Sequence, residues 1–216
     1  MARMAESFRT PYEKYDVLAK WDSPSWDDVT REVVRKRLQQ VPERQFLEPE
    51  EWTTLEAVCS RLIPQSDRGA DRVPIVPWID RKLISNQDVG YRYENMPPLR
   101  TAWRLGVAGI ENEGRRRHHA AFTELEGEQQ DRILGDIQNG MVEGDPWEEL
   151  PPARFFTAIL LKTVVGIYYA HPAAWGEVGF GGPASPRGYV RRELGGRDAW
   201  EAEERWNPVI PPEEKG

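Results

Sequence analysis

The segment ARFFTAILLKTVVGIYYAHP, residues 153–172, is the most apolar stretch of the chain and decides its fold class. It is long enough for a helix of several turns, and Pro172 at its end cannot continue a helix. A segment that is apolar nearly all round is typical of a helix buried inside a domain. We therefore expect a buried central helix here, closed by Pro172.

Outward from this segment, helix start and stop signals recur. Ser23 before Pro24 is a typical N-cap followed by a first-turn proline, and it predicts a helix that ends near Val41. A second helix is expected from Pro49, with two glutamates in its first turn, to Ile63. Further helices are expected from Pro77 to Ile84, from Pro97 and Pro98 through 115–117, and from 124 to the stop signal Asn139-Gly140.

The alternation of apolar and polar residues that marks a strand is hard to find. The sequence thus predicts an all-α fold of about six helices in one compact domain over residues 24–172. Residues 1–23 mix aromatic and charged side chains and are expected to form an arm that folds against something. Residues 173–216 are predicted to be a Gly/Pro/aromatic-rich docking loop with an extended tail.

Charge and hydropathy exclude two classes of partner. The net charge of -7 lacks the surplus of Lys and Arg that a phosphate backbone requires, so no nucleic-acid partner is expected. No stretch of about 18 uninterrupted apolar residues occurs, so no membrane span is expected. The N-terminal residues carry no apolar export signal, which predicts a cytoplasmic protein.

Cysteine and histidine give no catalytic or metal site. The single cysteine, Cys59, excludes an intrachain disulfide framework, a zinc site built on thiolates and a Cys-ligated iron–sulfur cluster, and its helical apolar context favours a buried hydrophobic role. Adjacent His118 and His119 point about 100° apart on a helix, and His171 precedes a proline at a helix end. We expect structural roles for all three histidines, no catalytic residue, no metal site and no cofactor on this chain.

The stretch WGEVGFGGPASPRGYVR, residues 175–191, suits neither a helix nor a strand. A dinucleotide loop would follow a strand, and Pro183 and Pro186 remove N–H donors that such a loop needs. A linker would not carry three large aromatic rings. The remaining interpretation is a rigid loop that docks on another protein. The candidate partner-binding residues are Trp175, Glu177, Phe180, Pro183, Arg187 and Tyr189.

Three phrases of the sequence together resemble a known family. They are LEPEEWTTLEAVCSRLIP (47–64), FTELEGEQQDRIL (122–134) and FFTAILLKTVVGIYYAHPAAWGEVGFGGPASPRGYVR (155–191). In this order they resemble the gluconate 2-dehydrogenase subunit 3 family, from about Phe46 to Tyr189.

The resemblance implies a non-catalytic small subunit that binds, stabilises and helps to mature a larger FAD-dependent oxidoreductase of the glucose-methanol-choline class. The complex would oxidise a sugar, glycoside or polyol, with FAD on the partner and an electron acceptor such as a cytochrome as a further partner. Exported members of the family share a twin-arginine signal. Because this sequence shows none, periplasmic location is expected only through co-export with a signal-bearing partner.

Two other functions stay open at this point. One is a free-standing enzyme or small-molecule-binding protein with a pocket between helices, in which Glu177, Arg187 or His171 would supply polar groups. The other is a homo-oligomeric scaffold without a flavoprotein.

Overall fold

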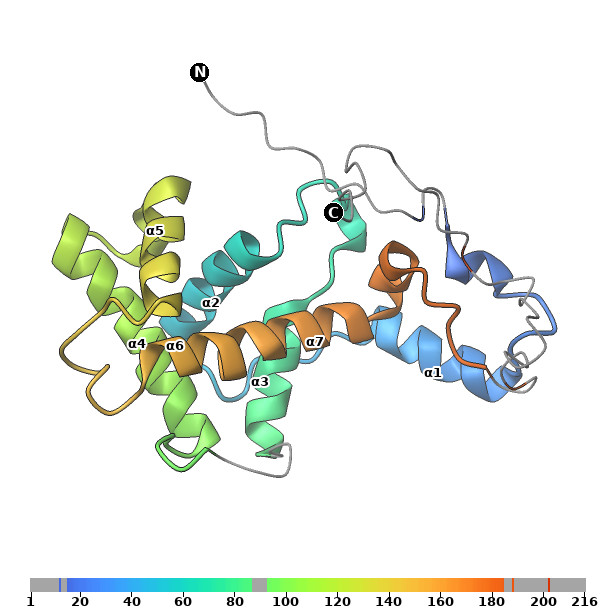
Figure 1. Ribbon diagram of the computed structural model, residues 1–216. Coiled ribbons are helices and arrows are strands. Elements are labelled where there is room, and N and C mark those ends of the chain that lie inside the picture. The colour runs from blue at the N-terminus through green and yellow to red at the C-terminus, as the bar shows by residue number, and fades with distance from the viewer. Residues whose placement is uncertain (1–11, 13–14, 87–92, 185–187, 189–201, 203–216) are drawn as a thin grey trace, which may run out of the picture. The chain divides into compact units, whose positions relative to one another are not determined.

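The computed structural model describes residues 12, 15–86, 93–184, 188 and 202, and within them it contains helices and no strands (Figure 1). The all-α prediction is therefore confirmed. Contacts divide the chain into two compact units: unit 1 groups residues 1–40 with 169–216, and unit 2 is the continuous stretch 41–168. Unit 1 thus contains both the predicted N-terminal arm and the predicted docking loop.

Unit 2 is built from helices that contact both their neighbours along the chain and helices further away in sequence. Helix α2 contacts α3, α4 and α5, and α5 contacts α6. The elements are α2 (Pro49–Leu62), η2 (Gly69–Asp71), α3 (Ile75–Ser85), α4 (Leu99–His118), η3 (Phe122–Glu124), α5 (Gly127–Gln138), α6 (Pro152–Arg154), η4 (Phe155–Leu161) and α7 (Lys162–Ala170), whose last two residues belong to unit 1.

The centre of unit 2 is an aromatic cluster that lies against a glycine face of α4. A Cβ atom at Gly106 would lie 2.0 Å from the Phe155 ring, and one at Gly109 would lie 2.4 Å from the Trp147 ring. Trp103 meets Phe155 edge to face, with 6.1 Å between ring centroids. The two glycines therefore allow large rings to approach the helix backbone closely, which an alanine would prevent.

A buried carboxylate ties the segment before α2 to α3. Asp80 is 0% exposed, and its side chain accepts backbone N–H bonds from Gln45 (2.8 Å), Phe46 (3.0 Å) and Leu47 (2.7 Å). Such bonds replace the water that the carboxylate loses on burial. Arg104 ties the same segment to α4, since its guanidinium lies 4.6 Å from the centroid of the Phe46 ring.

Arg117, which is paired with a second buried carboxylate, joins α4 to α5. Glu113, 2% exposed, accepts a 2.6 Å bond from Arg117 Nε, and Arg117 Nη1 reaches Asp136 at 2.5 Å. Burial lowers the pKa of the Arg117 guanidinium, but the hydrogen bonds and ion pairs with Asp136 and Glu113 raise it more, so the net pKa lies above its ordinary value. Arg117 is therefore charged and paired at every physiological pH.

Unit 1 contains η1 (Val17–Lys20), α1 (Asp28–Gln39) and η5 (Pro172–Val178), and η5 contacts both η1 and α1 (Figure 1). Its core consists of Val17, Trp26, Val34 and Trp175, all at most 4% exposed. Three of these residues come from the first 40 positions, and the fourth comes from the predicted docking loop. The described core of unit 1 thus requires residues 17–34 and Trp175 together.

Three predicted helix starts are wrong by a few residues, and one of them is that of α5, which was expected from 124 and begins at Gly127. Helix α1 begins at Asp28, because the Asp27 side chain is the N-cap and accepts a 2.7 Å bond from the Thr30 N–H. The expected cap at Ser23 instead lies in a turn. Helix α3 begins at Ile75, so Pro77 lies within its first turn, where a missing N–H breaks no helical bond.

The apolar segment predicted as a central helix is continuous from Pro152 to Ala170, with a π-helical middle at η4. Only one of its faces is buried, including Phe155, Leu160 and Val164, whereas Val165 is 36% exposed. Among the described helices it is the one candidate for a membrane span by length and composition, and 33% of its most apolar window is buried. A core helix of a soluble protein can have the same length and apolar composition.

Candidate functional site

The predicted docking loop begins as a short 3-10 helix, η5, and turns back on itself. Pro172 occupies the first turn, and the His171 ring accepts a 3.3 Å bond from the Ala173 N–H. Gly179 ends the element with a left-handed φ of 64°, after which the Phe180 N–H returns to the Trp175 carbonyl at 3.0 Å. The glycine at 179 is therefore a helix stop that reverses the chain.

Trp175 anchors the loop inside unit 1. It is 4% exposed and lies in the core with Val17, Trp26 and Val34, while the Phe180 ring meets it edge to face at 5.2 Å. Phe180 itself is 41% exposed, and Val178 is 43% exposed. One side of the loop is thus buried in the protein's own core, and the other presents two apolar side chains to solvent.

The glycines of the loop make room for the N-terminal segment. A Cβ at Gly176 would lie 2.6 Å from the Tyr15 carbonyl oxygen, and one at Gly179 would lie 2.7 Å from the Tyr12 ring. A Cβ at Gly182 would lie 2.9 Å from the Trp26 ring. Spaced three residues apart, these glycines fit the loop against the arm, and this close packing accounts for a composition that resembled a nucleotide-binding loop.

Two side chains of the N-terminal segment hold the far end of the loop. Trp26 Nε1 donates to the Pro183 carbonyl at 3.2 Å, and Lys20 Nζ donates to the Gly181 carbonyl. Both side chains are 1% exposed, and the Lys20 ammonium lies 5.3 Å from the centroid of the Trp26 ring. The two donors act on carbonyls that flank Gly182.

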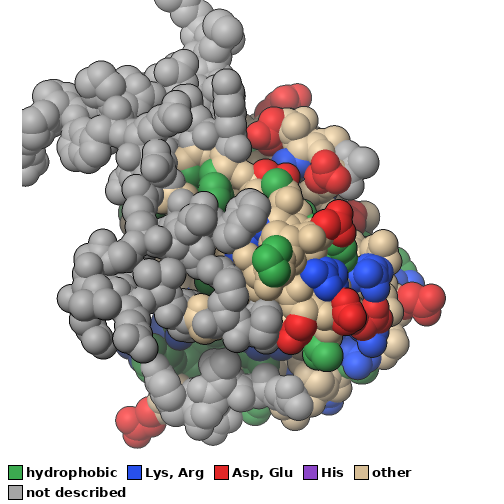
Figure 2. Space-filling model, turned by 90° about the vertical axis from the view of Figure 1, so that its right-hand side faces the viewer, with side chains coloured by type: hydrophobic (Ala, Val, Ile, Leu, Met, Phe, Trp, Pro, Cys, Tyr) green, Lys and Arg blue, Asp and Glu red, His purple; other side chains and the backbone are tan. Residues whose placement is uncertain are grey.

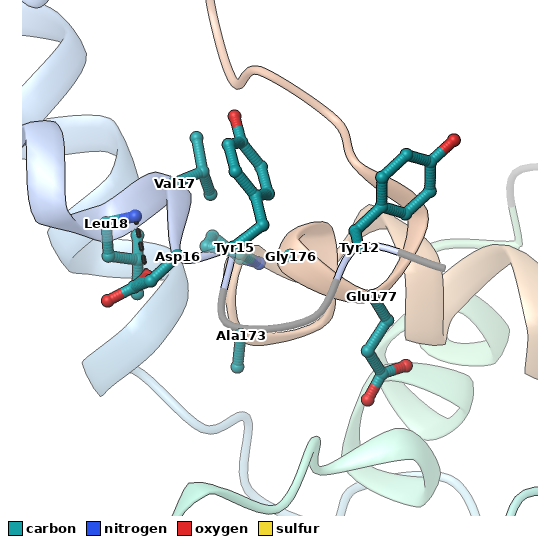
Figure 3. A pocket seen from close by; sticks show the side chains of 9 residues that line it. Tyr12, Tyr15, Asp16, Val17, Leu18, Ala173, Gly176 and Glu177 are labelled. Atoms are coloured by element: carbon teal, nitrogen blue, oxygen red, sulfur yellow. Dashed lines mark hydrogen bonds between the residues drawn. The ribbon is translucent and has the colours of Figure 1, made fainter. Parts of the chain in front are cut away.

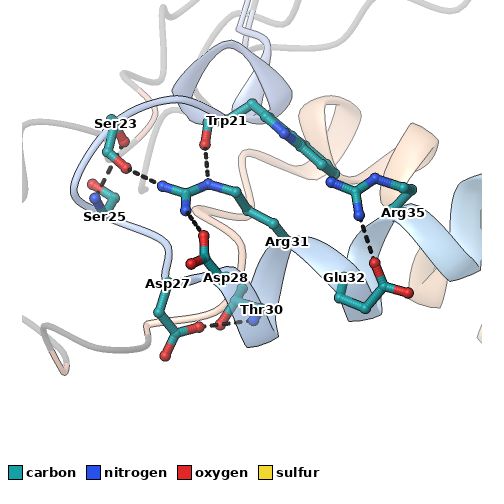
Figure 4. Close-up of polar contacts among 9 residues, drawn as sticks. All are labelled: Trp21, Ser23, Ser25, Asp27, Asp28, Thr30, Arg31, Glu32 and Arg35. Carbon is teal, nitrogen blue, oxygen red and sulfur yellow. Dashed lines mark hydrogen bonds and ion pairs between the residues drawn. The ribbon is translucent and has the colours of Figure 1, made fainter.

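The turn that carries these two side chains is braced from α1 (Figure 4). Arg31 donates from Nε to the Trp21 carbonyl at 2.8 Å and from Nη2 to the Ser23 carbonyl at 3.1 Å. Its third bond, at 2.7 Å, goes to Asp28 on its own helix. Because one guanidinium fixes two carbonyls of the turn, α1 sets the geometry of the residues between Lys20 and Trp26.

A pocket of about 230 Å³ lies between the N-terminal segment and η5 (Figure 3). The Tyr12 and Tyr15 rings extend to one side of it in the view, and the Glu177 carboxylate extends to the other. Asp16 uses its side chain to accept the Leu18 N–H at 2.9 Å. The polar groups around the pocket therefore do not converge on one point, as they do in a site built for a small ligand.

The six predicted partner-binding residues have different surroundings. Trp175 is buried, and Pro183 is half-buried with its carbonyl accepting from Trp26. Glu177 is half-buried beside the pocket, and Phe180 is exposed. Arg187 and Tyr189 lie outside the described residues. The structure thus brings Trp175, Phe180 and Pro183 into one loop, with Phe180 on its solvent side.

Sequence reasoning missed the role of Lys20, Trp26 and Arg31. The signal was present in WDSPSW, residues 21–26, where two tryptophans flank a turn-forming Ser-Pro-Ser. Because this segment was interpreted as the start of a helix, the burial of Trp26 in the core was not predicted.

The face shown in Figure 2 differs from a large apolar interface. Its described part carries acidic and basic side chains beside one another, with separate hydrophobic side chains between them. Among the described residues of unit 1, the exposed large hydrophobic ones are Val29, Val33, Val178 and Phe180. The described surface of this unit therefore carries small apolar areas.

The residues considered for catalysis have structural surroundings. Cys59 is 5% exposed, and burial, with a smaller contribution from the Glu56 carboxylate, raises the pKa of its thiol to about 12. His119 is the left-handed C-cap of α4, and His118 Nδ1 lies 3.3 Å from Gln129 Nε2. Within the described part of the chain, no three His, Cys, Asp or Glu side chains form a group that could hold a metal ion.

Comparison with known families gives a match over residues 49–182, to the family described as Gluconate 2-dehydrogenase subunit 3. The chain belongs to this family. The match covers more than half of the sequence and includes all of η5 and the loop glycines up to Gly182. The family description names one subunit of a dehydrogenase, which implies partner chains. Neither a comparison with curated proteins nor one with solved structures found a match.

Proposed function

We propose that this chain is a non-catalytic small subunit that binds and stabilises a large FAD-dependent dehydrogenase oxidising a sugar, glycoside or polyol. Membership of the gluconate 2-dehydrogenase subunit 3 family carries the proposal. In this proposal the FAD is bound by the partner, which also supplies the base for the substrate hydroxyl. An electron acceptor such as a cytochrome would complete the complex.

The geometry of the loop supports a docking role. Trp175 fixes the loop in the core of unit 1, so the conformation of the loop does not have to be selected when a partner binds. Phe180 and Val178 are exposed from this fixed backbone, and a partly exposed aromatic on a rigid loop is typical of interface anchors. A small subunit that binds only the folded partner stabilises it by mass action.

The first experiment is co-expression with a large FAD-dependent oxidoreductase of the glucose-methanol-choline class from the same genome, and expression of each chain alone. Soluble yield, bound-flavin absorbance and dehydrogenase activity are measured in each case. We expect flavin and activity to appear only, or far more strongly, in the co-expressed complex. A partner that is fully active alone, with this chain a folded monomer, would contradict the proposal.

The loop itself is tested with Phe180→Ala in the co-expressed complex. We expect the dissociation constant to rise by about thirtyfold, as for an interface anchor worth about 2 kcal/mol. Val33→Ala is the matched control, because Val33 is similarly exposed, at 48%, but lies on α1. If the control weakened the complex and Phe180→Ala did not, α1 and not the loop would be the docking element.

A further inference from the structure

The contacts of the loop with the N-terminal segment are concentrated at its last residues. Gly181 and Pro183 use their carbonyls to accept bonds from Lys20 and Trp26, and Gly182 between them has a φ of 72°. These contacts fix the backbone immediately after Phe180. At the other side, the Phe180 N–H is fixed by the Trp175 carbonyl. Phe180 is therefore held from both directions along the chain.

The N-terminal segment contributes to the exposed surface of the loop only indirectly, because the Lys20 and Trp26 side chains are themselves buried. Each is 1% exposed, whereas Phe180 is 41% exposed. Arg31 in turn fixes the carbonyls of Trp21 and Ser23, which lie between Lys20 and Trp26 in the chain. A continuous series of contacts therefore runs from α1, through the braced turn, to the exposed end of the loop, all within unit 1.

We propose that Lys20 and Trp26 are positioning residues, which hold residues 180–183 in the conformation that presents Phe180 to the partner subunit. This inference rests on the proposed function, since it assigns these two side chains a part in partner binding. It extends the site beyond the matched family region, because residues 20 and 26 precede residue 49.

Lys20→Met provides the test, because it removes the ammonium donor but keeps an unbranched apolar stem in the core. Removing the charged donor of a buried contact leaves its acceptor unsatisfied, so the melting temperature is measured beside the affinity. We expect a lower melting temperature, faster amide exchange at residues 180–182 of the isolated full-length chain, and a dissociation constant for the flavoprotein raised about fivefold or more. A purely structural role would lower the melting temperature without weakening binding.

Trp26→Phe is the second variant, which keeps an aromatic ring in the core but removes the donor to Pro183 and part of the ring that packs against Gly182. We expect it to change loop exchange and affinity in the same direction. Val34→Ala is the control, because Val34 belongs to the same core, whereas the described side-chain donors to the Gly181 and Pro183 carbonyls are Lys20 and Trp26. We expect a lower melting temperature with affinity within about twofold of the parent. This control separates loss of core stability from loss of loop positioning.

The outcomes distinguish the inference from the proposed function. If the parent chain binds and neither Lys20→Met nor Trp26→Phe changes loop exchange or affinity, the positioning role is wrong. If loop exchange rises and affinity stays unchanged, the two residues hold the loop but do not serve partner binding, which also overturns the inference. If the parent chain binds no flavoprotein, the proposed function fails, and the partner-binding part of the inference fails with it, whatever the exchange data show.

Discussion

The two units of this protein bury their apolar side chains in different ways. Unit 2 forms its core from the continuous stretch 41–168, in which helices adjacent in sequence also contact one another. Unit 1 joins Trp26 and Val34 to Trp175, across more than a hundred residues of chain. Local patterns of apolar residues describe the first kind of core well, and they contain no information about the second.

The largest expected effect comes from replacing Trp175 in unit 1, or Trp103 in unit 2, with alanine. Trp175→Ala should lower the free energy of unfolding of unit 1 by about 3–5 kcal/mol, because it leaves a cavity where a 4% exposed ring was packed. Trp103→Ala should do the same in unit 2. Amide hydrogen exchange resolved by segment is the measurement, and each variant should expose mainly its own unit. Loss of protection throughout the chain in both variants would show that the units unfold together.

The next effect tests the buried carboxylate of unit 2. Asp80→Asn should destabilise the protein by about 3 kcal/mol, because an amide cannot accept all the N–H groups of residues 45–47. Chemical denaturation measures the change. The matched control is Asp131→Asn, whose ion pair with Arg61 lies on the surface and should contribute less than about 1 kcal/mol. Equal effects of the two substitutions would contradict the importance given to the Asp80 contacts.

A smaller effect distinguishes glycines that are required from glycines that are not. Gly106→Ala should cost about 1–3 kcal/mol, because the added methyl group overlaps the Phe155 ring. Gly135→Ala should stabilise α5 by about 0.5–1 kcal/mol, because nothing lies within 4 Å of the position of its Cβ. Thermal unfolding should therefore shift in opposite directions. A loss of stability at both positions would mean that helical context, and not ring packing, determines the cost.

The smallest expected effect is the absence of a reaction. With its pKa raised to about 12, the Cys59 thiol stays protonated until the pH rises through that value, so only about 0.1% is thiolate at pH 9. Iodoacetamide at pH 7–9 should leave the folded chain unlabelled, and the same reagent in guanidinium chloride should label it fully. Rapid labelling of the folded chain would show that α2 opens locally.

The all-α class, the extents of α2 and α4 and the end of α5 could be predicted, since these helices have clear boundary residues and one apolar face. Helix α1 was misplaced at its start because Ser23-Pro24 satisfies the local rules for a cap, whereas burial of Trp26 decides the turn. The outer face of the 152–170 segment was expected to be buried, because composition alone does not indicate which side of a helix has a neighbour.

The stretch from residue 175 was expected to form no helix, but residues 175–178 belong to the 3-10 helix η5, and Phe180 after it is 41% exposed. The prediction assigned every aromatic ring of the stretch to a partner. The structure assigns Trp175 to the protein's own core, and the glycines to close contact with the N-terminal segment. A local pattern could not reveal this, because the glycines and the residues that they contact are far apart in sequence.

The core of unit 1, which joins residues far apart in sequence, also affects when this unit can fold during synthesis. A ribosome that has made Val34 must add more than a hundred residues before Trp175 exists, which at typical synthesis rates takes on the order of 10 s. During that interval Trp26 and Val34 lack the side chain against which they pack, while unit 2 can already fold. Trp175 thus completes the packing of residues made much earlier, and Trp26 and Val34 form an exposed apolar surface on the nascent chain until it is made.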